Sequence, residues 1–244
     1  MEFTVAAFNA HWGVGRFGHS RGVPFDAVEV VAGLDADLVV VPESFRDDDG
    51  RGMLDPLCEC GYRVETLHMS RLEDRKWGWR AKHDAVPHTG IWELAVCSRF
   101  PVLARRTYPM GTVRGDPAGP RRALSLKVSL GETQFEIIGV HTSSKLWQLA
   151  PVQHLRTLRD HIPEGGPQVL AGDFNFWGPA VSVGLRGWHR PVRGRTYPSK
   201  SPHSQIDHVL VRGGIDPIAG EVLAETPSDH RPIRARLRLA QTRG

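Results

Sequence analysis

Acidic, amide and imidazole side chains stand at the ends of several apolar runs in this chain. Carboxylates and amide oxygens bind divalent cations, and imidazoles exchange protons or donate hydrogen bonds to phosphate oxygens. Turns also favour Asp and Asn, so any one of these positions has an ordinary explanation. Six such strand ends in one chain indicate a shared site instead. The residues are Asn9, Glu43, His141, Asp173, Asn175, Asp207, Asp229 and His230.

The apolar runs that would position these residues are four to eight residues long, and several are rich in Val and Ile. Runs of this kind are typical of buried β-strands. Residues 25–34 and 146–161 instead repeat apolar residues at three- and four-residue spacing, which predicts helices. The segment Glu65–Gly90 is polar and irregular, which predicts a surface loop. The predicted strands lie in Phe3–Phe8, Leu38–Val41, Leu94–Cys97, Ala123–Val128, Phe135–Val140, Gln168–Ala171, Ile206–Val211 and Ile233–Leu239.

Strand, helix and strand follow one another in residues 3–41 and again in residues 135–171. This order predicts an α/β fold with two similar halves packed sheet against sheet. The 26 Gly and 18 Pro are spread over many turns rather than gathered in a linker, so we expect one domain over residues 1–244. Strand ends at one edge of such a fold converge on a single crevice, where the eight polar residues would meet.

Three short motifs occur along the chain, with the sequences Gly-Asp-Phe-Asn at 172–175, Ile-Asp-His-Val-Leu at 206–210 and Ser-Asp-His-Arg-Pro-Ile at 228–233. Together with the earlier polar residues, and in this order from Asn9 to Pro232, they resemble the endonuclease/exonuclease/phosphatase superfamily, which has the deoxyribonuclease I-like fold. The resemblance implies a four-layer α/β sandwich, in which two packed mixed β-sheets are flanked by helices. It also implies an enzyme that hydrolyses phosphoester bonds with a divalent cation, Mg²⁺ or Mn²⁺.

The resemblance also implies roles for the oxygen-bearing residues. Glu43 would be the main metal ligand, with Asn9 beside it and Asp229 as a further acidic ligand or as a residue that contacts a ligand. Mg²⁺ takes oxygen ligands and few protein carboxylates, which suits this set. Asp173 would orient or deprotonate the attacking water, and Asn175 would hold a non-bridging phosphate oxygen.

Two histidines complete the implied site. His230 would pair with Asp207, so that the carboxylate fixes the tautomer of the ring and favours the imidazolium. His141 would donate a hydrogen bond to the phosphate, and Glu93 is a candidate carboxylate partner for it. The chain reads Val-Pro-Glu-Ser around Glu43 and Val-His-Thr around His141, where many relatives have Gln before the Glu or Thr-His-Leu. These departures bear on the substrate more than on catalysis.

The charge distribution suggests where an anionic substrate would bind. The net charge of +4 is divided unevenly, because the first 93 residues carry −6 and the remainder +10. The 33 residues between Asp173 and Asp207 contain no acid. Arginine forks bind phosphate oxygens and aromatic rings stack on bases, so this segment is a candidate substrate-binding lip. The alternative is a solvated basic surface over a core that contains Trp188 and Tyr197. The candidate substrate-binding residues are Arg186, Arg190, Arg193, Arg195 and Trp177.

These patterns favour a metal-dependent phosphodiesterase, and among such enzymes a nuclease that acts on DNA or RNA. A phosphatase or phosphodiesterase for a small or lipid phosphate would use the same residues. A catalytically silent protein that only binds nucleic acid would have no use for the metal carboxylates. A dinucleotide-binding oxidoreductase is disfavoured, because residues 9–12 separate Gly13-Val-Gly15-Arg-Phe-Gly18 from the preceding strand.

Composition also bears on the compartment. The chain contains no stretch of 18 apolar residues, so we expect no transmembrane segment. The first residues lack the basic and apolar regions of a signal peptide, and three cysteines suit a reducing compartment. We therefore expect a cytoplasmic protein, and a monomer.

Overall fold

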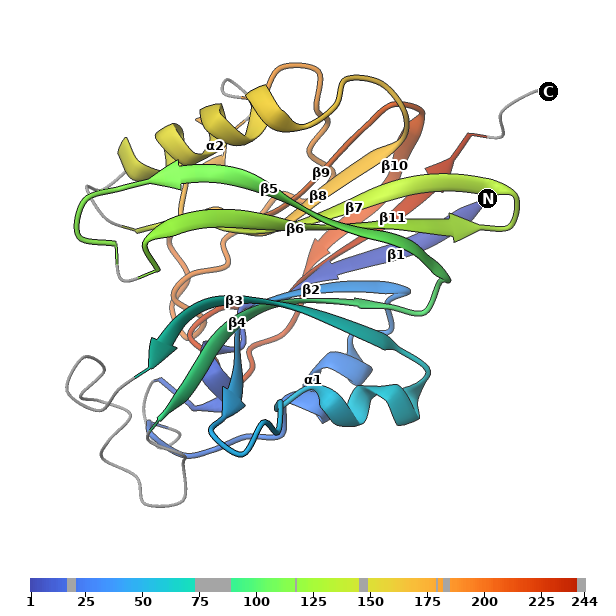
Figure 1. The fold of residues 1–244 in the computed structure, drawn as a ribbon. Helices are drawn as coiled ribbons and strands as arrows, with labels where there is room; N and C mark the ends of the chain where they lie inside the picture. The colour runs from blue at the N-terminus through green and yellow to red at the C-terminus, as the bar shows by residue number, and fades with distance from the viewer. Residues whose placement is uncertain are drawn as a thin grey trace.

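Two mixed β-sheets packed face to face form the centre of the fold (Figure 1). The computed structural model describes residues 1–16, 21–72, 89–116, 118–144, 149–178, 180–181 and 185–240. The six-stranded sheet has the order β10-β11-β1-β2-β4-β3, with bounds β10 (Ile215–Val222), β11 (Ile233–Leu239), β1 (Glu2–Ala7), β2 (Leu38–Asp47), β4 (Gly90–Ser98) and β3 (Arg63–Leu72). The five-stranded sheet has the order β5-β6-β7-β8-β9, with bounds β5 (Val102–Thr112), β6 (Pro120–Leu130), β7 (Thr133–His141), β8 (Gln168–Asp173) and β9 (Asp207–Arg212).

One helix covers the outer face of each sheet, which gives four layers (Figure 1). Helix α1 (Ala27–Gly33) follows β1 and precedes β2 in the chain, and these two strands are parallel. Helix α2 (Leu149–His161) in the same way follows β7 and precedes β8, which are also parallel. The other strand pairs are antiparallel, so both sheets are mixed. Short 3-10 helices occupy η1 (His11–Gly13) and η3 (Asp55–Cys60). The predicted four-layer α/β sandwich is confirmed.

Local sequence explains both helices. Asp26 caps α1, because its Oδ1 accepts hydrogen bonds from the backbone N–H groups of Val28 and Glu29. Helix α2 buries Leu155 and Leu158 against the five-stranded sheet, as the apolar spacing predicts. None of the described helices is long and apolar enough to cross a membrane.

Three apolar clusters fill the spaces between the four layers. The largest lies between the sheets, a second lies between the five-stranded sheet and α2, and a third lies between the six-stranded sheet and α1. Strands that contribute to two clusters carry apolar residues on both faces, which is why they appear in the sequence as continuous apolar runs.

The sheets approach each other closely at Gly139 in β7. A Cβ atom at this position would lie 2.8 Å from Val96 Cγ2 and 3.1 Å from Val40 Cγ1, both buried. We expect Gly139→Ala to lower the free energy of unfolding by about 1–3 kcal/mol, because an added methyl overpacks the core. Gly33→Ala is the control: its Cβ would meet no atom within 4 Å. The control should be neutral or slightly stabilising in urea unfolding, and equal effects of the two substitutions would contradict the packing argument.

The segment Glu65–Gly90 contains more strand than predicted. Strand β3 extends to Leu72, and β4 begins at Gly90, whereas residues 73–88 lie outside the described part. The prediction of a loop is therefore wrong for residues 65–72. Strand β3 is an edge strand with mostly half-exposed residues, so it lacks the apolar signal of a buried strand.

Strand direction determines where the polar residues meet. Strand β1 begins and β11 ends at one end of the sandwich in Figure 1, and β1 runs from that end toward the opposite end. Strands β7 and β8 end at His141 and Asp173, which are directly paired in the parallel register. The residues that follow β1, β7 and β8 therefore gather at the end of the sandwich opposite the start of β1.

Candidate active site

A cavity of about 600 Å³ opens at this end of the sandwich. Six of the eight predicted catalytic and metal residues line it, and the other two, Asn9 and Asp207, are buried behind them and hydrogen-bond to lining residues. The structure thus brings all eight together. The six lining residues are Glu43, His141, Asp173, Asn175, Asp229 and His230.

Glu43 reaches the cavity from within a strand rather than from a strand end. Strand β2 continues to Asp47, but its pairing with β4 shifts between Val41 and Ser44, and Glu43 adopts a positive φ of 55°. A bulge of this kind re-aims one side chain out of the regular alternation of the strand. The expectation that the strand ends before Glu43 is therefore corrected to a bulge within β2.

Asp173 is the hub of the hydrogen-bond network. Its Oδ2 atom accepts hydrogen bonds from Asn9 Nδ2 at 3.0 Å and Asn175 Nδ2 at 3.3 Å, and its Oδ1 atom accepts one from the Asn175 backbone at 2.8 Å. Burial and the neighbouring Asp207 raise the pKa of Asp173 to about 7, although the His230 charge opposes this. A carboxyl with this pKa can accept and release a proton near neutral pH, as a general base must.

His230 and Asp207 form the pair that the resemblance implies. His230 Nδ1 lies 2.8 Å from Asp207 Oδ2, and both residues are buried. Burial alone would lower the pKa of His230, but the carboxylates of Asp207 and Asp173 outweigh it and raise that pKa well above the usual value. The Nε2 atom lies 3.9 Å from both Asp173 Oδ2 and Asp229 Oδ1, so an imidazolium N–H faces the cavity.

His141 has different neighbours from those expected. Its Nε2 atom lies 3.5 Å from Asp173 Oδ2 and 3.7 Å from Glu43 Oε1. Glu93, the candidate partner, instead accepts hydrogen bonds from Arg46 and Thr66 through Oε1, so that prediction is wrong. Burial, together with the Arg121 charge, lowers the pKa of His141 well below the usual value. The ring is therefore neutral near pH 7.

The carboxylates of the cavity suit a divalent cation. Glu43 Oε2 and Asp229 Oδ1 are buried and accept no hydrogen bond from the described residues. Burial and the charge of Asp229 raise the pKa of Glu43 to about 8, so these groups repel one another until a positive charge offsets them. A buried oxygen without a donor is a position that a metal can occupy.

Two neighbouring groups of residues could hold this ion. Glu43 and Asp229 supply the orphan oxygens, whereas ligand atoms of Asp173, Asp207 and His230 lie within 4.8 Å of one another. The second group already contains the close Asp207–His230 hydrogen bond, whereas the oxygens of the first group have no donor among the described residues. Asn9 Oδ1 accepts a hydrogen bond from the His11 backbone at 3.0 Å, which leaves it one further lone pair. Its role as a ligand stays a prediction.

Ser228 ties the two ends of the chain together at the site. Its Oγ atom donates a hydrogen bond to the Asn9 carbonyl at 2.6 Å and accepts one from the His230 backbone at 3.3 Å. The loop before β11 is thereby fixed to the end of β1. This contact holds His230 and Asn9 in one constellation, although 219 positions separate Ser228 from Asn9.

A buried arginine network beside the cavity is not predicted from the sequence. Arg121 lines the cavity and forms a bidentate ion pair with Asp116, at 2.6 and 2.9 Å. Its Nη1 atom donates a hydrogen bond to the His141 carbonyl at 2.8 Å, and its guanidinium stacks 5.1 Å from the Trp92 ring. His154 of α2 approaches the same carboxylate at 3.8 Å. Arg121 is one of many arginines in the sequence, so only its position in the fold distinguishes it.

Aromatic side chains form further walls of the cavity, and the sequence argument does not assign them to the site. Trp12 and Trp92 meet edge to face at 6.2 Å, and Trp92 meets the His141 ring at 5.3 Å. Tyr197 lies 4.9 Å from the ring of His230. These rings fix the orientation of both histidines.

The predicted substrate-binding residues divide into two groups. Arg190, Arg193, Arg195 and Trp177 line a second cavity next to the catalytic one, whereas Arg186 is exposed outside both. Trp188 is buried, as the alternative interpretation has it, whereas Tyr197 is half-buried and lines the catalytic cavity.

The arrangement supplies the parts of a phosphoester hydrolase. Asp173 can take a proton from water, and His230 presents an N–H group to a phosphate in the cavity. The amide of Asn175 instead donates its hydrogens to the Thr142 carbonyl and to Asp173. A divalent cation held by Glu43 and Asp229 would offset charge on the phosphate oxygens. A general base, N–H donors and a countercharge are what phosphoryl transfer requires.

Comparisons with known proteins agree with this geometry. A family model described as "Endonuclease/Exonuclease/phosphatase family" matches residues 7–230. The uncharacterized protein YbhP of Escherichia coli K12 is 28% identical over 262 aligned positions, which cover 98% of this chain and 97% of YbhP.

Two solved structures share the fold at low sequence identity. The mannosyl-6-phosphatase Bt3783 of Bacteroides thetaiotaomicron is 17% identical with a TM-score of 0.70, over 97% of this chain and 100% of the other. TDP2 of D. rerio, solved with a single-strand DNA product, is 14% identical with a TM-score of 0.66, over 97% and 99%. With the family match covering nearly the whole chain and every implied catalytic residue gathered at one cavity, this chain belongs to the endonuclease/exonuclease/phosphatase family.

Proposed function

We propose that the protein is a divalent-metal-dependent phosphodiester hydrolase and that its substrate is a strand of DNA or RNA. The observation that carries the proposal is the hydrogen-bond hub at Asp173, which lies beside buried carboxylate oxygens of Glu43 and Asp229 that have no donor among the described residues. Such oxygens are costly in a purely structural site, and a bound cation with a phosphate explains them.

The charge around the cavity supports a nucleic acid. A segment of 33 residues without an acid follows Asp173 and places three arginines and Trp177 beside the catalytic cavity. The D. rerio TDP2 structure contains a single-strand DNA product on the same fold, which shows that the fold can present such a strand. Phosphate contacts by arginine supply most of the affinity for nucleic acid.

A small phosphate ester is the second candidate. The cavity volume of about 600 Å³ lies within the range of small-molecule sites. The mannosyl-6-phosphatase Bt3783 has the same fold. An enzyme of this kind would prefer a phosphomonoester to an oligonucleotide.

Removal of divalent ions tests the reaction class. We expect EDTA to abolish phosphodiester hydrolysis and excess Mg²⁺ or Mn²⁺ to restore it, because the Glu43 and Asp229 carboxylates would otherwise face each other unneutralised. Hydrolysis is followed with bis(p-nitrophenyl) phosphate, and Mn²⁺ binding is measured separately by calorimetry. Activity that persists in EDTA would exclude the metal from the mechanism.

A substrate panel separates the two candidates. Single- and double-stranded DNA, RNA, p-nitrophenyl phosphate, mannose 6-phosphate and phosphoinositide vesicles are compared at equal metal concentration by their kcat/KM values. We expect the largest value for a nucleic acid. A larger value for a phosphomonoester would replace the nuclease by the second candidate.

A further inference from the structure

A second cavity, of about 480 Å³, lies beside the catalytic one and is basic. We refer to it as the arginine cavity. Three arginines, one histidine and one tryptophan line it, and no carboxylate from the described part of the chain does. These residues are Arg190, Arg193, Arg195, His203 and Trp177.

The positive charge of this cavity is not compensated from within the described chain. No ion pair joins Arg190, Arg193 or Arg195 to a carboxylate among the described residues. Exposed arginines elsewhere in the described chain do form such pairs, and examples are Arg51, Arg71, Arg159 and Arg238. The Nη1 atom of Arg190 is buried without a hydrogen-bond partner. Burial and the neighbouring Arg193 charge lower the pKa of Arg190. Like charges held this close favour a bound anion.

The backbone makes room for the Arg190 guanidinium and fixes the loop next to it. A Cβ atom at Gly178 would lie 2.3 Å from Arg190 Nη1, so a larger residue at this position would displace the guanidinium from where it lies. Gln205 accepts a hydrogen bond from the Gly194 backbone at 3.2 Å and donates one to the Val192 carbonyl at 3.1 Å. The arginine cavity is therefore formed before a ligand binds, which lowers the entropic cost of binding.

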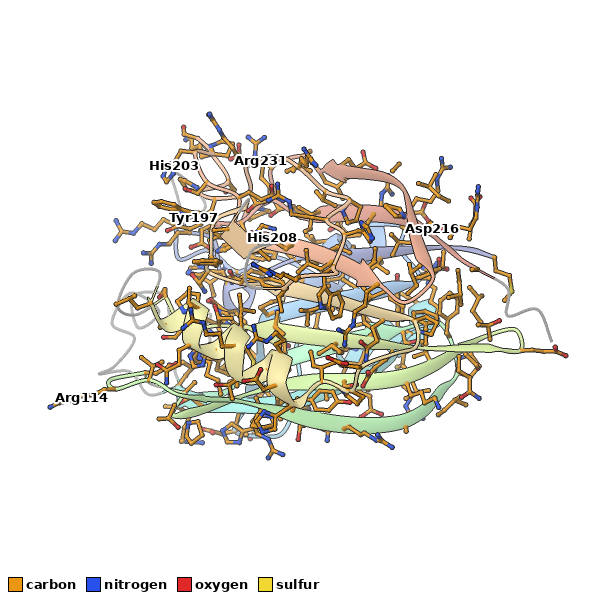
Figure 2. All side chains as sticks on the ribbon, turned by 90° about the horizontal axis from the view of Figure 1, so that it is seen from above. Arg114, Tyr197, His203, His208, Asp216 and Arg231 are labelled. Atoms are coloured by element: carbon orange, nitrogen blue, oxygen red, sulfur yellow. The ribbon has the colours of Figure 1, made fainter. Side chains whose placement is uncertain are left out.

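The two cavities are neighbours. Tyr197 stands between them, because its ring lies 4.9 Å from His230 on the catalytic side and 6.4 Å from His203 of the arginine cavity. Figure 2 shows Tyr197 and His203 at the same end of the molecule, away from Asp216. Asn175 lines the catalytic cavity, and Trp177, two residues later, lines the arginine cavity. A ligand that occupies both therefore carries two anionic groups a short distance apart.

Trp177 adds a flat apolar surface to this basic cavity. Its side chain is 56% exposed, whereas large apolar residues are normally covered. An exposed indole next to arginines suits a base stacked beside its own phosphate. A small phosphate ester has neither a second phosphate nor a base to place here.

We propose that the arginine cavity is a subsite for a second phosphate of the same nucleic-acid strand, with Trp177 stacked on the adjoining base. This inference rests on the proposed phosphodiesterase function, and it adds a reason why the enzyme would prefer a nucleic-acid strand to a single diester. A strand with a charged linkage next to the scissile one is bound at both cavities, and a single isolated diester is bound at the catalytic cavity alone.

The decisive experiment compares two substrates across three variants. Arg193→Gln and Arg195→Gln remove exposed arginines of the arginine cavity, and Arg186→Gln removes an exposed arginine of the same segment outside it. With a single-stranded oligonucleotide, we expect each of the first two variants to lose about tenfold in kcat/KM. With bis(p-nitrophenyl) phosphate, which has one diester and no second phosphate, all three should match the wild type. Arg186→Gln should match it with both substrates.

Chemical changes in the strand provide an independent comparison. A single neutral methylphosphonate linkage beside the scissile position should lower the wild-type kcat/KM to the level of Arg193→Gln and should have no added effect on that variant. The salt dependence of oligonucleotide binding should weaken by about 0.7 in log–log slope for each arginine removed. Equal losses on both substrates, or no loss on the oligonucleotide, would overturn the subsite.

Failure of the proposed function would look different. If the wild type hydrolyses no phosphoester, the function is wrong, and the subsite is then decided by fluorescence anisotropy of a labelled oligonucleotide without metal. Weaker and less salt-dependent binding by Arg193→Gln, but not by Arg186→Gln, would still support it. Identical binding by all variants would exclude it.

Discussion

The Glu43→Gln variant is expected to lose phosphodiester hydrolysis by about 10³-fold or more. Gln has nearly the same shape, but its neutral amide cannot offset the charge of a cation. The variant should also bind Mn²⁺ more weakly in calorimetry. The fold should persist, because burial beside Asp229 raises the pKa of Glu43 to about 8 and makes its negative charge unfavourable in the metal-free protein. Metal-free Glu43→Gln should therefore be at least as stable as the wild type in thermal unfolding at pH 8.

Glu59→Gln provides the matched comparison, because Glu59 is exposed on η3, away from the cavity. It should leave kcat, metal affinity and melting temperature unchanged. If Glu43→Gln keeps more than a tenth of the wild-type kcat, Glu43 is not the main metal ligand.

The second large effect concerns stability. Asp116→Asn is expected to lower the free energy of unfolding by about 3–5 kcal/mol, because it leaves the Arg121 guanidinium buried without its counter-charge. The side chains of Asp116 and Arg121 are 0% and 4% exposed. Urea unfolding followed by tryptophan fluorescence measures the change. Activity should fall as well, since Arg121 also holds the His141 carbonyl.

The effect of Asp116→Asn should depend on pH in one direction. Burial opposes ionisation of Asp116, but the nearby His154 ring and the ion pair with Arg121 outweigh it and hold the pKa of Asp116 below its usual range. The stabilisation from a carboxylate with a depressed pKa is present above the pKa of the unfolded chain, about 3.9, and is lost as the pH falls below it. The difference between wild type and variant should therefore be constant above about pH 5 and shrink below pH 4. Asp160→Asn removes an exposed pair with Arg159 and should cost less than about 1 kcal/mol.

The layer order of this fold follows from the sequence to a large extent. Continuous apolar runs identify strands that lie between two apolar layers. The helices are identified by their apolar faces, which are visible in the sequence. The exceptions are informative. Strand β3 is an edge strand with half-exposed residues, so burial leaves little mark on its sequence.

The site is predicted less completely than the fold. Residues of distinctive chemistry, such as Asp173 and His230, stand out because few other roles suit them in short motifs. Arg121 and Asp116 do not, since arginine and aspartate are common on surfaces. Their burial depends on long-range packing, in which α2 lies against β5 and its His154 approaches Asp116, and no local pattern encodes this. The prediction that Glu93 is the partner of His141 is wrong for the same reason, because Glu93 accepts a hydrogen bond from Arg46 on the neighbouring strand.

The backbone around the cavity has a consequence for how this protein tolerates change. Four residues other than glycine, His11, Trp12, Glu43 and Asn175, adopt positive φ at or beside the site. Such conformations cost about 1–3 kcal/mol each and persist only where the surrounding structure imposes them. The backbone geometry of the cavity therefore lowers the stability of the fold. Selection for stability alone would favour Gly or Asn at His11, Trp12 and Glu43, and these substitutions would change the residues that form the cavity. The stability that remains to tolerate mutations elsewhere is therefore smaller than the well-packed core suggests.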